Sequence, residues 1–99
     1  MFYIYILYSQ AKDKYYVGYS KDFAKRLKEH NDLTLGGNTF TRKNGPWELK
    51  AAFECGESES DAIQIERFIK DQKSRRLIEK IISGEPLHGL LGGLARVLP

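Results

Sequence analysis

The sequence predicts an α+β fold: a small three-stranded, largely antiparallel sheet flanked by helices, in the order ββαβαα. Three observations predict it. Two tyrosine-rich runs of alternating residues lie on either side of a short polar turn, and a third alternating run follows a loop rich in glycine and asparagine. Segments with helical periodicity, preceded by capping residues, come between and after these runs.

The first two runs predict an antiparallel hairpin. Residues 2–8 and residues 15–20 both alternate as strands do, and residues 10–14 between them are short and polar. Gly18 interrupts the second run, where a bulky residue would stabilise a strand. A glycine at such a position predicts either a β-bulge or the close approach of another group.

A basic helix follows the hairpin. Asp22 is a good N-cap, and the helix should end near Asn31. Arg26 and His30 are four residues apart and are expected to share one face, while the opposite, apolar face packs on the sheet. Residues 32–46 carry the glycine, asparagine and proline signals of a loop.

The sequence after this loop predicts one further strand and two helices. Residues 47–54 alternate as a third strand. Ser60 is expected to cap the next helix and Ser74 the last one, which should end close to Gly84.

A chain of 99 residues has room for one domain, which we place at residues 1–83. Residues 84–99 form an apolar, glycine-rich tail whose glycines argue against an isolated helix. Three roles stay open for this tail: docking on the domain, self-association into a homodimer, or disorder.

Composition limits the cellular location and the kind of partner to be expected. No run of about 18 apolar residues is present to cross a membrane, and the N-terminal segment lacks the basic region of a signal peptide. Cys55 is the single cysteine, so no internal disulfide is possible and a cytoplasmic location is expected. The formal net charge of +3 is weak evidence for an anionic partner.

Several short motifs occur in a specific order and together resemble those of the GIY-YIG nuclease superfamily. The resemblance is closest to its small stand-alone bacterial members, which are similar to the N-terminal nuclease module of the UvrC repair excinuclease, and it covers roughly residues 2–82. Tyr3 stands where the family's first triplet has glycine, and nothing after residue 83 resembles the family. The matching segments are Tyr3-Ile4-Tyr5, Tyr16-Val17-Gly18, residues 19–27 with Arg26, Phe40-Thr41-Arg42, Gly45-Pro46-Trp47 and residues 66–70 with Glu66.

The resemblance implies a hydrolase, a phosphodiesterase acting as an endonuclease on DNA, with one divalent ion, Mg²⁺ or Mn²⁺, as cofactor. It also implies a structure-specific activity linked to DNA repair or processing. Five residues match the family's catalytic positions or complete the polar cluster: Tyr5, Tyr16, Arg26, His30 and Glu66.

The chemistry of these five side chains suits phosphodiester hydrolysis. Tyr5 is a candidate general base if a cation stabilises its phenolate or a neighbour accepts its proton. Arg26 donates two hydrogen bonds to a phosphate, and Glu66 is a hard oxygen ligand for the metal. Tyr16 would orient the attacking water or a phosphate oxygen, while His30 would assist as base or hold phosphate.

Basic residues flank this predicted site and are expected to track a nucleic-acid backbone without reading its sequence. We expect DNA in preference to RNA, no membrane, and a partner protein where recognition needs more specificity than this domain supplies. The candidate nucleic-acid-binding residues are Gly18, Lys21, Lys25, Lys28, Thr41, Arg42 and Lys43.

Two other functions remain compatible with the sequence. One is a catalytically weak nucleic-acid-binding module that acts with a partner protein. The other is a protein-interaction domain whose tyrosine-rich face binds protein. Each residue alone also has a plain structural explanation, because tyrosines stabilise paired strands and Glu66 with Lys70 forms an ordinary helical ion pair.

Overall fold

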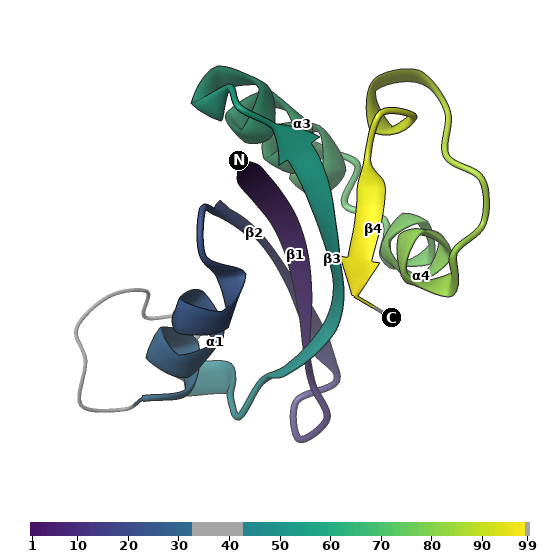
Figure 1. The fold of residues 1–99 in the computed structure, drawn as a ribbon. Helices are drawn as coiled ribbons and strands as arrows, with labels where there is room; N and C mark the ends of the chain where they lie inside the picture. Colours follow the sequence, from purple (N-terminus) through teal and green to yellow (C-terminus); the bar gives the residue numbers. More distant parts are fainter. Residues whose placement is uncertain (33–42, 99) are drawn as a thin grey trace.

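The computed structural model describes residues 1–32 and 43–98. It confirms the predicted α+β class: an antiparallel sheet flanked by helices (Figure 1). The sheet has four strands in the spatial order β2-β1-β3-β4. The strands are β1 (Phe2–Ser9), β2 (Lys14–Ser20), β3 (Glu48–Gly56) and β4 (Ala95–Leu98); the helices are α1 (Phe23–Asn31), α3 (Glu59–Asp71), α4 (Arg75–Ser83) and the short 3₁₀ turn η1 (Gly89–Leu91).

The fourth strand corrects the prediction of three. It comes from the C-terminal tail, which returns to the domain and pairs antiparallel with β3, Arg96 lying opposite Phe53. The Arg96 guanidinium also donates to the backbone carbonyls of Ile81 and Ile82 near the end of α4, at 2.9 and 2.5 Å. β4 has four residues and follows several glycines. Its sequence is therefore too short to show the alternation of apolar and polar residues that predicts a strand. Of the three roles left open for the tail, docking on the domain is the one observed, and self-association stays a prediction.

The two faces of the sheet support two separate cores. On one face, aliphatic residues of β1 and β3 such as Ile4, Ile6 and Ala51 pack against Ile69 of α3 and Ile81 of α4. On the other face, the buried set contains Tyr5, Leu7, Trp47 and Ala52, covered by Phe23 and Leu27 of α1. The alternation of β1 therefore sends isoleucines to one core and a tyrosine to the other.

Side-chain caps define where the helices begin. The Asp22 carboxylate accepts from the backbone N–H of Lys25, and the Ser74 hydroxyl accepts from that of Leu77, as predicted. The prediction of Ser60 as a cap was wrong. Ser58 caps α3 instead, because its hydroxyl accepts from the Asp61 backbone, and Ser60 lies inside the helix. Gly84 ends α4 in the left-handed conformation.

No helix within residues 1–32 and 43–98 combines the length and the apolar character needed to cross a bilayer.

Candidate active site

Gly18 makes room for the ring of Tyr5. The two residues lie opposite each other in the β1–β2 ladder, which runs without a register shift. A β-carbon added to Gly18 would lie 2.5 Å from Cζ of Tyr5 and would overlap its hydroxyl oxygen. The close approach predicted for Gly18 is therefore confirmed, and the alternative of a bulge in this strand pair is wrong.

The hydroxyl of Tyr5 is hydrogen-bonded to His30. Tyr5 is 2% exposed, and its Oη lies 3.0 Å from Nε2 of His30, 25 residues away on α1. His30 is itself buried. The expectation that His30 shares an outward face with Arg26 was therefore wrong: the helix turns the imidazole to the sheet, where the phenol of Tyr5 satisfies it.

Tyr16 completes an aromatic cluster around this pair. Its ring centroid lies 4.9 Å from that of His30 and 6.5 Å from that of Tyr5. Trp47, immediately before β3, packs on Tyr16 with 6.2 Å between the ring centroids. The rings of Tyr5 and Tyr16 thus belong to one aromatic cluster, and Gly18 leaves the room that the Tyr5 ring occupies.

α3 brings Glu66 and Lys70 to the same place. The Lys70 ammonium lies 5.1 Å from the centroid of the Tyr16 ring and 3.3 Å from the carboxylate of Glu66. The Glu66 side chain is 17% exposed, and its negative charge is one of the smaller causes that raise the pKa of Tyr5, after burial and Tyr16. The predicted metal ligand is therefore linked to Tyr16 through Lys70, which contacts both.

Arg26 extends α1 toward solvent at the rim of the cluster. Its side chain is 53% exposed, and its contact with Glu29 at 3.6 Å is a surface ion pair of small worth. Arg26 lines a recess of about 300 Å³ together with Ser20, Lys21 and Lys25. Two of the predicted phosphate-binding lysines are therefore adjacent to the arginine.

Burial sets the protonation of the central pair. Burial raises the pKa of Tyr5 far above its ordinary value of 10, and the positive charge of Arg26 opposes this without reversing it. Burial, and then Arg26, lower the pKa of His30 below its ordinary 6.5, with Glu29 opposing. Near neutral pH the pair is thus a phenol beside a neutral imidazole. A stable Tyr5 phenolate, considered from the sequence, is not what this environment favours.

The other predicted nucleic-acid contacts are less tightly placed. Lys28 and Lys43 are exposed. Thr41 and Arg42 lie outside the described residues. Lys21 packs its ammonium over the ring of Phe2, at 5.2 Å.

Three positions at the site were not predicted from the sequence. Trp47 packs on Tyr16, and Lys70 lies over the same ring. The side-chain amide of Asn31 exchanges two hydrogen bonds with the backbone of Trp47, at 2.6 and 2.8 Å, and so ties the end of α1 to β3. The four-residue spacing of Glu66 and Lys70 predicted their ion pair. Contacts between segments that are distant in the sequence could not be predicted from any local pattern.

The donor set fits one loosely held divalent ion. Within the described part of the chain, no group of three histidine, cysteine, aspartate or glutamate side chains could hold a metal. Glu66 is the predicted carboxylate ligand, and its charge and that of Glu29 both act on Tyr5. This fits Mg²⁺ or Mn²⁺, which keep several water ligands and take others from a bound phosphate, and does not fit a closed structural metal site.

Comparison with known proteins identifies the family of the chain. The model of the GIY-YIG catalytic domain matches residues 1–80. A structure-specific endonuclease subunit SLX1 from Eremothecium gossypii is 35% identical over 96 residues, which cover 85% of this chain and 31% of that protein. The subunit of the same name from Scheffersomyces stipitis is 32% identical over 108 residues, covering 96% of this chain and 32% of that protein.

The chain spans about a third of the length of these curated relatives. A UPF0213 protein from Bacillus halodurans, solved by solution NMR, is 32% identical, with a TM-score of 0.49 and coverage of 86% of each chain.

The chain belongs to the GIY-YIG family of catalytic domains. This membership confirms the predicted superfamily and the predicted enzyme class, a GIY-YIG-type nuclease domain and hence a hydrolase.

Proposed function

We propose that this chain is a divalent-metal-dependent endonuclease that hydrolyses phosphodiester bonds in DNA at structural features such as branches, flaps or ends. The observation that carries the proposal is the buried Tyr5–His30 hydrogen bond, surrounded by Tyr16, Arg26 and Glu66. A tyrosine core that served only for packing would not need the buried histidine hydrogen-bonded to Tyr5.

The Tyr5–His30 pair provides a path for a proton. The imidazole is neutral near pH 7 because its pKa is lowered, so Nε2 is able to accept a proton. We propose that Tyr5 takes the proton of the attacking water and passes its own hydroxyl proton to His30. At the same time the bond from the water oxygen to phosphorus forms, the bond from phosphorus to the leaving oxygen breaks, and the leaving oxygen takes a proton from solvent. The phenolate then never has to persist in a buried site that disfavours it.

Arg26 and Tyr16 would position the phosphate. The Arg26 guanidinium is permanently charged, and its planar fork matches two phosphate oxygens. The aromatic wall of Tyr16, backed by Trp47, fixes the direction of its hydroxyl. Holding the reacting groups in register and placing positive charge where negative charge grows are the main sources of catalysis in phosphoryl transfer.

Glu66 would hold the metal ion. A divalent ion bound there supplies charge stabilisation on the phosphate oxygens and lowers the pKa of bound water. Glu66 is held by Lys70, which orients the carboxylate and offsets its charge next to Tyr5.

The relatives guide the proposed role. Both SLX1 proteins are named as subunits of structure-specific endonucleases. By analogy we propose that this chain acts in DNA repair or processing and that a partner protein adds specificity, while exposed lysines such as Lys21 and Lys25 attract the phosphate backbone.

Cleavage of a panel of single-stranded, duplex, flap and branched DNA, with RNA counterparts, tests the proposal. We expect cleavage of DNA with Mg²⁺ or Mn²⁺ and none with EDTA. Arg26→Ala should abolish cleavage while the circular dichroism spectrum is unchanged, because Arg26 lies at the surface. Salt-sensitive binding with no turnover of any substrate would contradict the proposal and favour a binding module.

A further inference from the structure

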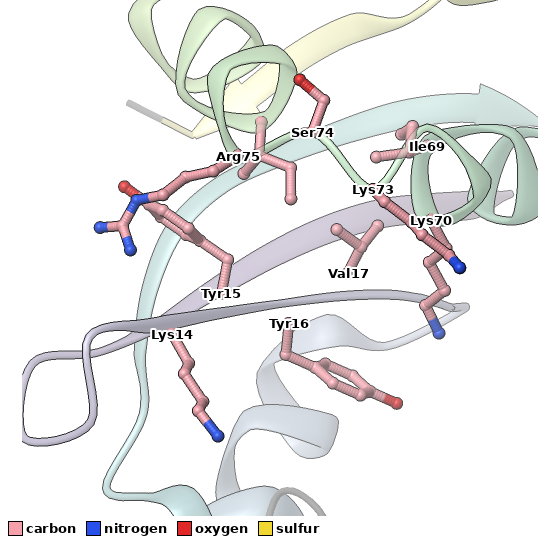
Figure 2. Close-up of a pocket in the computed structure, with 10 residues that line it drawn as sticks. Lys14, Tyr15, Tyr16, Val17, Ile69, Lys70, Lys73, Ser74 and Arg75 are labelled. Carbon is pink, nitrogen blue, oxygen red and sulfur yellow. The ribbon is translucent and has the colours of Figure 1, made fainter.

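A groove of about 470 Å³ runs along β2, the outer strand of the sheet, where α3 meets α4. Its floor is apolar: Val17 and Ile69, both almost fully buried, lie at its base, and the partly exposed side chains of Tyr15 and Ile78 supply its accessible apolar surface. Figure 2 shows Arg75 and Tyr15 at one end and Lys70 and Lys73 at the other, with Val17 between them. The volume is within the range of pockets that bind organic ligands.

The rim of this groove is basic. Four cations line the groove, Lys14, Lys70, Lys73 and Arg75, and none of the ten lining residues is acidic. Figure 2 shows the Lys14 side chain leaving β2 on the side away from Val17, so the other three cations form the rim. α4 also begins here, with its N-cap Ser74 in the lining, so the positive end of the helix dipole adds to the same field. A groove of this charge is complementary to a polyanion.

The four cations are not equivalent. Arg75 is held by Asp13 at 2.5 Å and by Glu79 at 3.4 Å, and Lys70 is paired with Glu66. For Lys73, no ion pair is recorded with any described residue. Lys73 also adopts a left-handed backbone with φ of 47°, where asparagine or glycine would be easier to accommodate. Its charge is therefore the one most available to a ligand.

The groove meets the active site at the edge of the sheet. Tyr16 and Lys70 line it, and the same two residues contact His30 and Glu66 respectively. Figure 2 shows the Tyr16 ring on the side of β2 opposite to Val17, so a strand whose phosphate is held at the site would reach the groove by passing round β2, the edge strand, beside Lys70.

We infer that this groove binds a single-stranded segment of DNA that leaves the active site, with its phosphates along the basic rim and its bases on the apolar floor. The inference rests on the proposed nuclease function and specifies the structural feature that the domain recognises. A duplex turns its phosphates outward and keeps its bases stacked, so it would use the rim alone, whereas an unpaired strand can use both rim and floor.

Binding measured without cleavage tests this inference. A fluorescent oligothymidylate of about ten nucleotides, a length within the site size of single-strand binding folds, is titrated by anisotropy in EDTA. Lys73→Asn removes the charge and tolerates the left-handed backbone, whereas Lys73→Arg keeps the charge. For Lys73→Asn we expect the slope of log affinity against log salt to decrease by about 0.7. Lys73→Arg should bind as the wild type does.

A matched control removes a positive charge from α4, at a position away from the groove. Lys80 lines a different recess of the surface, near Phe68 and Leu87, so Lys80→Gln should leave the salt slope unchanged. A second titration with blunt duplex of the same length should show a smaller loss for Lys73→Asn than the single strand does.

Three results would overturn the inference. The first is an unchanged salt slope for Lys73→Asn. The second is an equal loss for single strand and duplex, which would show general attraction rather than a strand-specific groove. The third is an oligoglutamate peptide that binds as tightly as the oligonucleotide and is equally sensitive to Lys73→Asn. Because the readout is binding in EDTA, failure of the wild type to cleave DNA would contradict the proposed function without affecting this result.

Discussion

The two faces of the sheet carry residues of different kinds. The face under α3 and α4 is aliphatic, with Ile4 and Ile6 of β1 fully buried there. The face under α1 buries Tyr5 and His30, which are hydrogen-bonded to each other inside an aromatic shell. Alternate residues of one strand therefore contribute to different tasks: even-numbered residues build a core, and Tyr5 between them belongs to the candidate active site.

This difference shows how a small domain can hold a polar site without losing its stability. Burying a phenol and an imidazole costs free energy unless both are hydrogen-bonded, and here each satisfies the other. Among the described residues, no buried side-chain nitrogen or oxygen lacks a hydrogen-bond partner. The aliphatic face supplies most of the favourable burial, which leaves the opposite face available for chemistry.

The largest expected effect separates chemistry from stability. Tyr5→Phe keeps the ring but removes the hydroxyl that we place on the proton path. We expect the single-turnover cleavage rate to decrease by about 10²–10³-fold, the usual loss for one such group. The free energy of unfolding should change by only about 1 kcal/mol, because one buried hydrogen bond is lost. Cleavage at the wild-type rate would remove Tyr5 from the mechanism.

The converse prediction concerns a substitution on the aliphatic face, which should affect stability and not cleavage. Ile6→Ala should lower the free energy of unfolding by about 2–5 kcal/mol, because it leaves a cavity in a fully buried site. The folded fraction should still cleave close to the wild-type rate. Urea denaturation and a rate corrected for the folded fraction measure the two quantities. Ile6→Val, which should cost about 0.5–1.5 kcal/mol, provides a graded control, and a rate loss as large as that of Tyr5→Phe would mean that the two faces are not separable.

A smaller effect is expected at the contact between the hairpin strands. Gly18→Ala places a methyl group against the Tyr5 ring, which must move away from His30. We expect at least a tenfold loss of cleavage, since displacement of a catalytic group by about 1 Å costs up to about 10²-fold. Gly93→Ala is the matched control because nothing lies within 4 Å of its added carbon. Equal activity of the two variants would show that the ring position is unimportant.

The smallest effect concerns pH. Protonation of His30 is harder in the folded chain than in the unfolded one, because burial and Arg26 lower its pKa below 6.5. Its contribution to the free energy of unfolding is therefore complete above about pH 6.5 and is lost as the pH falls through the lowered folded pKa. His30→Gln should flatten the dependence of the urea midpoint on pH in this range. Wild type and variant with the same slope would argue that His30 is not buried as a neutral imidazole.

Much of the fold followed from local patterns. The hairpin, α1, β3 and α4 were predicted close to their observed limits, since alternation, capping side chains and Gly84 act within a few residues of one another. The fourth strand could not be predicted, because four residues after a glycine-rich turn gain their strand conformation only from pairing with β3. The choice between Ser58 and Ser60 was missed because two serines separated by one residue offer the same cap.

The site was predicted in its residue types but not in its geometry. Tyr5, Tyr16, His30 and Glu66 do come together, and Gly18 does mark a close approach. The inward direction of His30 was missed, since a polar residue on a basic helix is ordinarily expected to face solvent, and its partner lies on another strand. The roles of the individual residues in catalysis stay predictions.

We propose that the cluster of Tyr5, Tyr16 and His30 cleaves phosphodiester bonds with a divalent ion held at Glu66. Single-turnover cleavage of a branched DNA by wild type and by Glu66→Gln, across a titration of Mn²⁺, tests this proposal. The wild type should show saturable, Mn²⁺-dependent cleavage. Glu66→Gln, although folded, should lose this activity by at least about 10²-fold. Cleavage by Glu66→Gln at the wild-type rate and with the same Mn²⁺ dependence would contradict it.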